Sequence, residues 1–433
     1  MLAIFLVSPI SSSQGGQEEA LTLESAIQMA LVRNEKALTA DAKISVADAQ
    51  LTRARAFFLP SITVSGNYTR RPFEVVRVVG NSQIIVQNYN ALSGNAQLNM
   101  TLFDSRSIPA LKQAKNEQLS TAYATAETKR QLAFEVGNAF LTTLGTDQML
   151  EAAKHRFEYA QQALDAAKAR FAAGLVSSND VTRAELEYAS AEMSITQMKG
   201  QVESNYLELG NLLDDTQAIG KKLVVPDFLV KGGAEIPADV EPLIEEAQNR
   251  RLDLTALQLH ARAQHALLIE PTLKWLPTLN LNARYSYTNE AGLTGRSFNW
   301  NAGLTLSWAV FDGLNRNADY QERKSLAYQA DLSVLSSKRS IDLSVRDALV
   351  SLQSQRAGLK QAQIAYDIAK QNAQEVAELY RQGLSSVLQV ADANYQLFNA
   401  EVGLVRQRYN LGIAYLNFEA ALGLDPFGKE PII

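Results

Sequence analysis

The spacing of apolar residues along the chain alternates between two regular patterns. From Leu23 to Phe58, apolar side chains recur about every three or four residues among Ala, Gln and Lys, the spacing of one face of an α-helix. Pro60 ends this segment, because proline lacks the amide hydrogen that a helix needs. Beyond Pro60, apolar and polar residues alternate, which predicts a β-strand.

The same change of pattern recurs later in the chain. Pro60 and Pro277 stand in matching surroundings 217 residues apart, and the match extends without gaps into the flanking helix and strand. The surroundings of Gly174 and Gly383 match as well, at an offset of 209. Since repeated sequences form repeated structural units, we expect two tandem copies of one unit.

Each copy is predicted to contain a helix, a β-hairpin, a long helix, a tight turn and a returning helix. The first copy covers 21–213, with the hairpin at 61–104, the long helix at 105–173, the turn at 174–178 and the last helix at 179–213. The second covers 240–422, with the same elements at 278–312, 313–382, 383–386 and 387–422. Residues 214–239 link the copies, and 423–433 form a tail.

The predicted long helices are incompatible with a compact globular domain. Each has about 70 residues and spans roughly 105 Å at about 1.5 Å per residue. The helix before each hairpin and the helix after each turn together reach a similar length. Two short helices can therefore stack end to end beside one long helix and form a wall of uniform thickness.

The turns between the long and returning helices have capping residues at both ends. Gly174 and Gly383 stand where a helix C-cap glycine belongs. The serines that follow are candidate N-caps of the returning helices: Ser177 and Ser178 in the first turn, Ser385 and Ser386 in the second.

The predicted strands have one apolar face and one face of Asn, Gln, Ser and Thr. This pattern is typical of a membrane β-barrel, and a hairpin half-buried on a soluble core is the alternative. Trp300 and Trp308 lie on one face, roughly 26 Å apart in a strand, close to the height of a barrel's apolar band. Because a barrel needs about eight strands and the chain has four, the chain must oligomerise to close one.

Composition narrows the possible functions. With 41 Lys and Arg against 46 Asp and Glu, the net charge is −5, so nucleic acid is an unexpected partner. No apolar run approaches the roughly 18 residues of a membrane-spanning helix, which excludes a helical transporter. The absence of cysteine among the 433 residues excludes disulfides, thiolate metal sites, cysteine nucleophiles and an acylated cysteine.

The sequence contains no motif for catalysis, cofactor binding or metal binding, so we expect neither an enzyme nor a cofactor. His155, His260 and His265 lack the spacing of zinc ligands. Asp214 and Asp215 predict the end of a helix, with a cation site as the alternative.

The N-terminus, residues 1–20, begins with an apolar stretch that small and polar residues follow. This pattern indicates a signal peptide without its basic segment, and a disordered tail is the alternative.

The repeats and the turns resemble those of the TolC-type outer-membrane efflux proteins. The resemblance covers nearly the whole chain after about residue 20 and is most specific at residues 170–181 and 380–387. It implies a mainly α-helical protein with a membrane β-barrel portion, closed only as a homotrimer with four strands from each chain. It also implies that long coiled-coil helices form an α-barrel that extends from the outer membrane into the periplasm.

The resemblance also implies partners and site residues at the turns, which we call the tips. The tips would dock onto a periplasmic adaptor, or membrane fusion protein, linked to an inner-membrane pump of the RND, ABC or MFS type. The docking residues would be Gly174, Leu175, Ser177, Gly383, Leu384 and Ser386.

Three residues match positions of the family's periplasmic gate: Asp180, Tyr380 and Asp392. Ser385 and Gln389 stand where some relatives have an arginine and an aspartate, so this chain departs from their salt-bridge latch. Asp180 also has a simpler interpretation, because an acidic residue stabilises a helix N-terminus by about 0.3–1 kcal/mol. Trp300 and Trp308 would belong to an aromatic girdle in the lipid bilayer.

The sequence therefore predicts a passive outer-membrane exit duct of a tripartite system for small molecules. A type I protein-secretion duct has the same architecture and is the first alternative. A periplasmic coiled-coil scaffold without a pore is the second. The sequence does not identify the cargo, because a wide lumen of Asn, Ser and Thr has little means to discriminate.

Overall fold

The computed structural model describes residues 20–80, 82–215, 221–226, 229, 239–290 and 295–430. Almost all of the expected signal peptide, most of the linker between the copies and the last residues of the tail lie outside this part. The chain divides into two compact units, which we describe separately. The first is Met1–Thr39, Thr128–Arg251 and Ile341–Ile432, and the second is Ala40–Glu127 and Leu252–Ser340.

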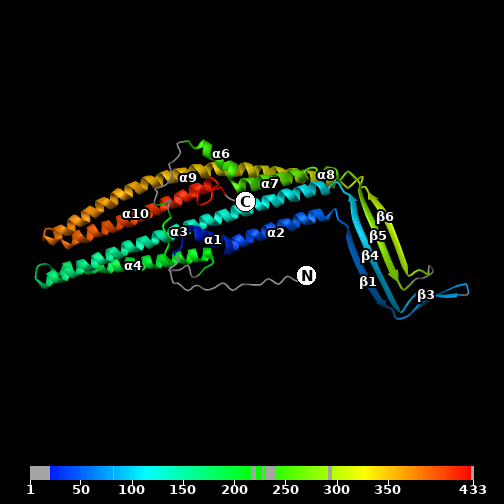
Figure 1. Cartoon of the computed structure of the whole chain (residues 1–433), viewed down its shortest axis with the longest axis horizontal. Coiled ribbons are helices and arrows are strands. Elements are labelled where there is room, and N and C mark those ends of the chain that lie inside the picture. Colours follow the sequence, from blue (N-terminus) through cyan, green and yellow to red (C-terminus); the bar gives the residue numbers. More distant parts are fainter. Residues whose placement is uncertain are drawn as a thin grey trace, which may run out of the picture. The chain divides into compact units, whose positions relative to one another are not determined.

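Helices account for most of the described residues, which confirms a mainly helical chain (Figure 1). The helices are α1 (Leu23–Arg33), α2 (Glu35–Ala56), α3 (Ser107–Ala172), α4 (Ser178–Leu213), α6 (Glu241–Arg250), α7 (Leu252–Leu267), α8 (Glu270–Leu273), α9 (Asn315–Arg381) and α10 (Val387–Ala421). The strands are β1 (Ser61–Arg70), β2 (Val75–Val79), β3 (Ser82–Gln87), β4 (Asn90–Phe103), β5 (Thr278–Thr288) and β6 (Phe298–Ser307).

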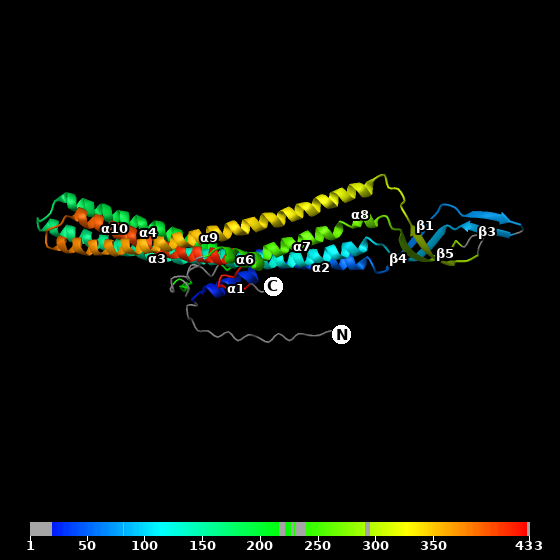
Figure 2. The same cartoon turned by 90° about the horizontal axis from the view of Figure 1, so that it is seen from above.

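The first unit is a helical bundle in which α4 and α10 lie beside the C-terminal parts of α3 and α9 (Figures 1 and 2). Fully buried apolar side chains from three of these helices form its core: Phe140 and Leu141 of α3, Leu209 of α4 and Leu416 of α10. Burying a large apolar side chain contributes about 1.5–3 kcal/mol, so this core holds the bundle together.

The helix before each hairpin is interrupted, whereas the sequence predicted a continuous helix. It is broken once in the first copy and twice in the second, where α7 and α8 are also separate. Asn34 is extended, with ψ 135°, between α1 and α2, and Arg251 is extended, with ψ 119°, between α6 and α7. The Asn34 side chain donates to the Leu212 carbonyl oxygen and accepts from the Lys36 amide, both at 2.9 Å. It thus replaces the helical hydrogen bonds that the break removes.

The second unit contains the strands. In its described residues, β1, β4, β5 and β6 form an antiparallel sheet in that order. The first hairpin differs from the prediction, because a smaller hairpin of β2 and β3 is inserted between β1 and β4. Gly80, with φ +61°, lies in its turn between two runs of β-branched residues, where glycine adopts the left-handed backbone most readily.

Candidate functional site

The first tip joins α3 to α4 through a glycine in the left-handed conformation. Gly174 has φ +72°, which costs about 1–2 kcal/mol for a residue with a Cβ. Its amide donates to the Phe171 carbonyl at 2.9 Å, and the Leu175 amide donates to the Arg170 carbonyl at 2.9 Å. These two bonds form a Schellman motif, which satisfies the last carbonyls of the helix. The Leu175 side chain is 75% exposed.

The second tip has the same geometry. Gly383 has φ +78°, and its amide donates to the Tyr380 carbonyl at 3.1 Å. The Leu384 amide donates to the Leu379 carbonyl at 2.8 Å, and the Leu384 side chain is 71% exposed. Both glycines therefore form the predicted C-caps, and each tip presents one leucine to solvent. Docking by these residues stays a prediction.

The helices that return from the tips begin with capping boxes. The Asp180 carboxylate accepts hydrogen bonds from the Ser177 amide at 3.0 Å and the Ser177 hydroxyl at 2.9 Å. In the second tip, the Gln389 side-chain oxygen accepts from the Ser386 amide and the Ser385 hydroxyl, each at 2.9 Å. Asp180 therefore stabilises the start of its own helix, as the simpler interpretation predicts.

Tyr380, another predicted gate residue, is buried between helices of the two tips. Arg170 of α3 donates to the Tyr380 carbonyl oxygen at 3.0 Å, and its guanidinium carbon lies 4.0 Å from the centroid of the Tyr380 ring. The ring packs in an apolar cluster with Leu164, Val387 and Val390. In the part of the chain that the structure describes, the buried Tyr380 hydroxyl has no hydrogen-bond partner.

Asp392, the third predicted gate residue, is exposed on α10 and accepts a hydrogen bond from Gln396 at 2.8 Å. The structure thus places Asp180, Tyr380 and Asp392 in three separate sets of contacts. Arg170 links the tips through a hydrogen bond to Tyr380, although the sequence showed it only as part of the first tip motif.

Arg156 is a second residue that the sequence did not identify. Only 5% exposed, it lies on α3 and donates two hydrogen bonds to Glu187 of α4, at 3.0 and 2.8 Å. It also donates to Ser194 at 3.0 Å, and its guanidinium carbon lies 5.1 Å from the ring centroids of Tyr395 and Phe398 on α10. Arg156 therefore ties α3, α4 and α10 together.

The four-stranded sheet has one apolar face that runs across all its strands. The backbone register aligns Val64 of β1 with Ala96 of β4, Tyr285 of β5 and Trp300 of β6. In this chain the apolar face is open to solvent, and Val64 and Trp300 are 76% and 72% exposed. An apolar surface of this extent usually marks a contact with lipid or protein.

The opposite face of the sheet is polar. Neighbouring strands are linked there by side-chain hydrogen bonds, from Arg284 to Gln97 at 3.0 Å and from Thr101 to Asn280 at 3.1 Å. Among the described strands, β1 pairs only with β4 and β6 only with β5. The sheet therefore has two edges with unpaired backbone groups.

The two tryptophans of the predicted girdle differ in position. Trp300 lies in β6, but β6 ends at Ser307, so Trp308 follows the strand rather than belonging to it. Its indole nitrogen donates to the Trp275 carbonyl oxygen at 3.0 Å, a contact with the segment that enters β5. The expected strand thus ends one residue before the second tryptophan.

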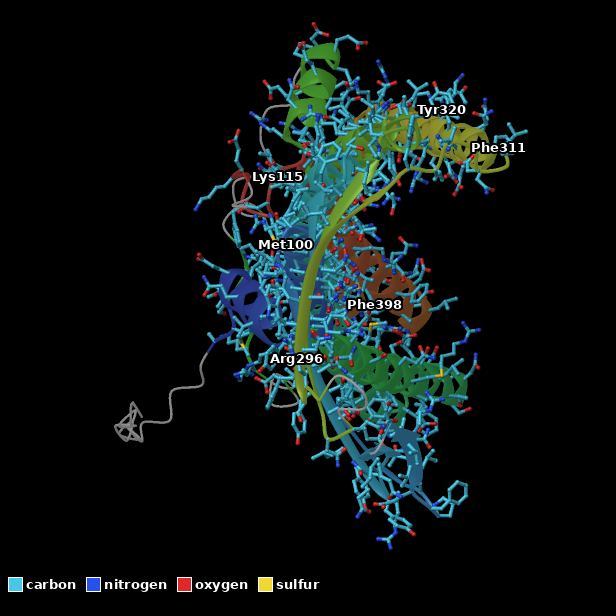
Figure 3. All side chains as sticks on the ribbon, turned by 90° about the vertical axis from the view of Figure 1, so that its right-hand side faces the viewer. Met100, Lys115, Arg296, Phe311, Tyr320 and Phe398 are labelled. Atoms are coloured by element: carbon cyan, nitrogen blue, oxygen red, sulfur yellow. The ribbon has the colours of Figure 1, made fainter. Side chains whose placement is uncertain are left out.

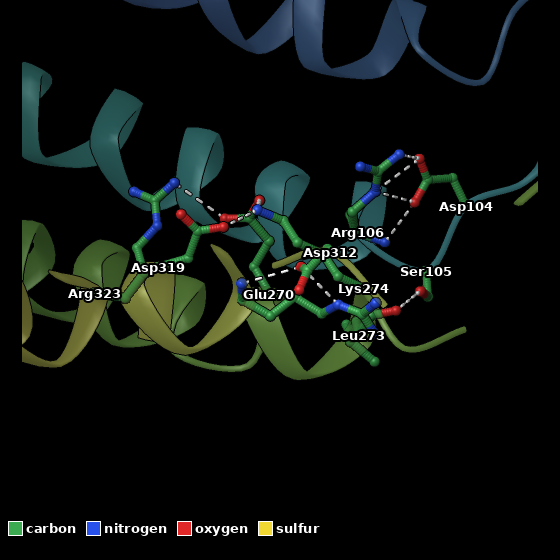
Figure 4. A network of polar contacts seen from close by, with 10 residues as sticks. Asp104, Ser105, Arg106, Glu270, Leu273, Lys274, Asp312, Asp319 and Arg323 are labelled. Carbon is green, nitrogen blue, oxygen red and sulfur yellow. Dashed lines mark hydrogen bonds and ion pairs between the residues drawn. The ribbon is translucent and has the colours of Figure 1, made fainter. Parts of the chain in front are cut away.

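Ion pairs surround the points where strands pass into long helices (Figure 4). Arg106 donates to both carboxylate oxygens of Asp104, at 2.8 and 2.5 Å, and holds the pKa of Asp104 below its usual range. At the equivalent point of the second copy, the Arg316 Nε donates to Asp312 at 2.8 Å. Lys274 reaches Asp319 at 2.5 Å. These pairs fix the start of each long helix.

Other candidate chemistry has structural explanations. Asp214 ends α4 with φ 48°, which confirms the predicted helix end. His260 contacts Glu117 at 2.9 Å, and His265 contacts Asp331 at 3.0 Å. Within the described residues, no group of three metal-ligating side chains occurs. None of the described helices is long and apolar enough to span a bilayer.

Comparison with known proteins identifies the family. The model of the outer membrane efflux protein family matches residues 26–214 and 243–424. The chain is 25% identical to Nodulation protein T of Rhizobium leguminosarum bv. trifolii, over 94% of this chain and 87% of that protein. It is 23% identical to Outer membrane protein TolC of Escherichia coli (strain K12), over 94% of this chain and 83% of TolC.

The fold is similar to that of a solved outer-membrane channel. The Campylobacter jejuni CmeC channel aligns with a TM-score of 0.79 and 16% identity, over 95% of this chain and 87% of CmeC. Since the family model matches most of the residues, the chain belongs to the outer membrane efflux protein family.

Proposed function

We propose that the chain forms, as a homotrimer, the passive outer-membrane exit duct of a tripartite efflux system. Cargo would diffuse through the lumen, and an inner-membrane pump of the RND, ABC or MFS type would supply the energy. The protein itself would act as a conduit and not as an enzyme.

The sheet is the observation that carries this proposal. Its exposed apolar face suits lipid, and its opposite face of Asn, Gln, Ser and Thr suits a water-filled lumen. In lipid, unpaired backbone groups at a sheet edge are too costly, so β1 of one copy should pair with β6 of the next. Three copies with four strands each exceed the lower limit of about eight strands for a barrel.

The helices would form the periplasmic part of the duct. We assign one repeat to 21–213 and the other to 240–422, with equatorial segments at 214–239 and 423–433. Exposed leucines on rigid turns are good anchors for a partner, so the tip residues support docking to a periplasmic adaptor.

The closed end of the duct would involve Asp180, Tyr380 and Asp392, with Arg170 as an additional link. The contact of Arg170 with Tyr380 supports a connection between the tips within one chain. Since the Asp180 carboxylate caps its own helix, it would not form a salt bridge that holds the end closed. It would instead act on closure through its negative charge in the lumen.

Purification and conductance test the proposed function. We expect the protein to require detergent for extraction, to run as a trimer in native mass spectrometry and to conduct ions across planar bilayers. A monomer that stays soluble without detergent and gives no conductance would refute the duct and favour the scaffold.

A further inference from the structure

An arginine stands at the loop end of each edge strand: Arg70 ends β1, and Arg296 comes two residues before β6. On β1, the alternation that places Tyr68 on the apolar face continues to Arg70. Next to β6, Arg296 stands two residues before Phe298, and the Ser297 carbonyl still accepts a backbone hydrogen bond from β5 at 2.8 Å. Both arginine side chains are exposed, and Figure 3 labels Arg296. The two cations thus lie at the loop ends of the two edge strands.

No described carboxylate forms an ion pair with the side chain of Arg70 or of Arg296. The nearby Glu290 carboxylate is occupied by Arg71 and by the Asn88 amide at 2.8 Å, and Arg71 holds the pKa of Glu290 below its usual range. Within the described residues, the side chains of Arg70 and Arg296 have no hydrogen-bond or ion-pair partner. Their charges are therefore available to an anion.

Aromatic side chains separate the arginines from the aliphatic part of the face. The Phe298 ring lies 4.9 Å from the ring of Tyr287 and 6.0 Å from that of Tyr285, measured between centroids. Aromatic residues of this kind prefer the level of lipid headgroups. Along the strands, the face thus changes from aliphatic to aromatic to cationic, which matches the acyl chains, the interface and the phosphate of an anionic lipid.

We propose that Arg70 and Arg296 bind the phosphate of an anionic membrane lipid whose acyl chains lie on the apolar face. This inference rests on the proposed function, because pairing of β6 with β1 of the next copy would set these two strands, with an arginine at the loop end of each, about 4.8 Å apart. A guanidinium group binds phosphate through two parallel hydrogen bonds. Each site would then be shared between two copies and would join them.

Lipid retention by the purified trimer tests this site. The trimer is incubated with equal amounts of dioleoyl phosphatidate and dioleoyl phosphatidylcholine, and bound lipids are counted by native mass spectrometry. We expect a preference for phosphatidate that falls about fivefold with Arg70→Gln or Arg296→Gln and about thirtyfold with both. Arg70→Lys should keep only part of the preference, because the charge remains but the two parallel hydrogen bonds of the guanidinium are lost.

Arg284→Gln is the matched control, because Arg284 lies on the polar face beside Gln97 and should not alter the preference. An excess of inorganic phosphate should not displace the lipid. Equal binding of the two lipids, an unchanged double variant or displacement by inorganic phosphate would overturn the proposal. A trimer that conducts but shows no preference refutes only the lipid site, whereas a soluble monomer refutes the duct itself.

Discussion

Glu419 shows how the fold changes the chemistry of a single residue. Its side chain on α10 is only 7% exposed, and one carboxylate oxygen has no hydrogen-bond partner among the described residues. Burial raises the pKa of Glu419 above its usual range, and burial likewise raises the pKa of Tyr415 to about 12. A carboxyl group with a raised pKa opposes folding when it must ionise.

Replacing Glu419 by Gln should therefore remove a pH-dependent loss of stability. The pKa of Glu419 is higher in the folded than in the unfolded protein. The protonated side chain therefore contributes its full stability below the pKa of the unfolded state, and this stability is lost as the pH rises through the pKa of the folded state. We expect Glu419→Gln to unfold at a higher temperature than the parent at pH 7.5 and to lose this advantage near pH 4. Thermal unfolding of both proteins from pH 4 to 8 measures this difference in unfolding temperature.

The exposed Glu192 provides the control, because Glu192→Gln removes the same charge from the surface of α4. Its unfolding temperature should follow that of the parent at each pH. A Glu419→Gln variant that is less stable than the parent at pH 7.5 would contradict this prediction and show that favourable partners outweigh the burial of the carboxylate.

Single residues were predictable where their role depends on the local chain. Gly174 and Gly383 cap helices through bonds to residues three to five positions earlier, so the sequence around them is sufficient. Arg156 and Arg170 could not be predicted, because their partners Glu187 and Tyr380 come from other helices. The contact of Trp308 with the Trp275 carbonyl could not be predicted either, because the two residues are far apart in the sequence.

Among whole elements, the long helices and long strands followed from periodicity, and the interruptions did not. The breaks at Asn34 and Arg251 lie 217 residues apart, the same offset that relates Pro60 to Pro277. One extended residue leaves the apolar spacing on both sides intact, so this spacing alone does not reveal the break. The β2–β3 hairpin was missed although Gly80 and Asn81 between β-branched runs are a hairpin signal.

The tip turns should depend on glycine because of their positive φ. We expect Gly174→Ala and Gly383→Ala each to lower the free energy of unfolding by about 1–2 kcal/mol, since alanine is strained in the left-handed region. Gly200→Ala is the control: Gly200 lies inside α4 with open space around it, and alanine there should stabilise by about 0.5–1 kcal/mol. Denaturant unfolding of the three variants checks both signs.

The exposed tip leucines should matter for docking and not for folding. We expect Leu175→Ser combined with Leu384→Ser to reduce crosslinking to the periplasmic adaptor about tenfold or more, since buried anchor residues contribute about 2 kcal/mol or more. Leu186→Ser is the control, because Leu186 is 71% exposed, as Leu384 is, but lies outside the tips. This variant should leave crosslinking unchanged. Equal crosslinking of all variants would count against docking at the tips.

At the scale of the whole molecule, the single chain leaves its sheet incomplete. Both edges of the sheet lack a partner among the described strands, and its apolar face is exposed. The alternating pattern predicted both the two faces and the need for further copies, because four strands cannot close a barrel. The register between copies could not be predicted, since it depends on how β1 and β6 of different chains align.

Disulfide trapping should define that register. The chain contains no cysteine, so each introduced pair reports one contact. We expect Ala302→Cys in β6 to form an intermolecular disulfide with only one or two of Ile62→Cys, Val64→Cys and Gly66→Cys in β1. A disulfide requires Cβ atoms about 3.5–4.5 Å apart, which selects directly opposed positions. Non-reducing gels should then show bands up to the covalent trimer and none beyond it.

Leu98 and Ala283 supply the control, because they are paired within one chain on the inner strands β4 and β5. Leu98→Cys with Ala283→Cys should form an intramolecular disulfide and run as a monomer. Since three closed edge contacts leave no strand edge open, crosslinking must stop at three copies. A ladder that continues beyond the trimer would mean that β1 and β6 pair in an open chain of copies, and a closed barrel of three would be wrong.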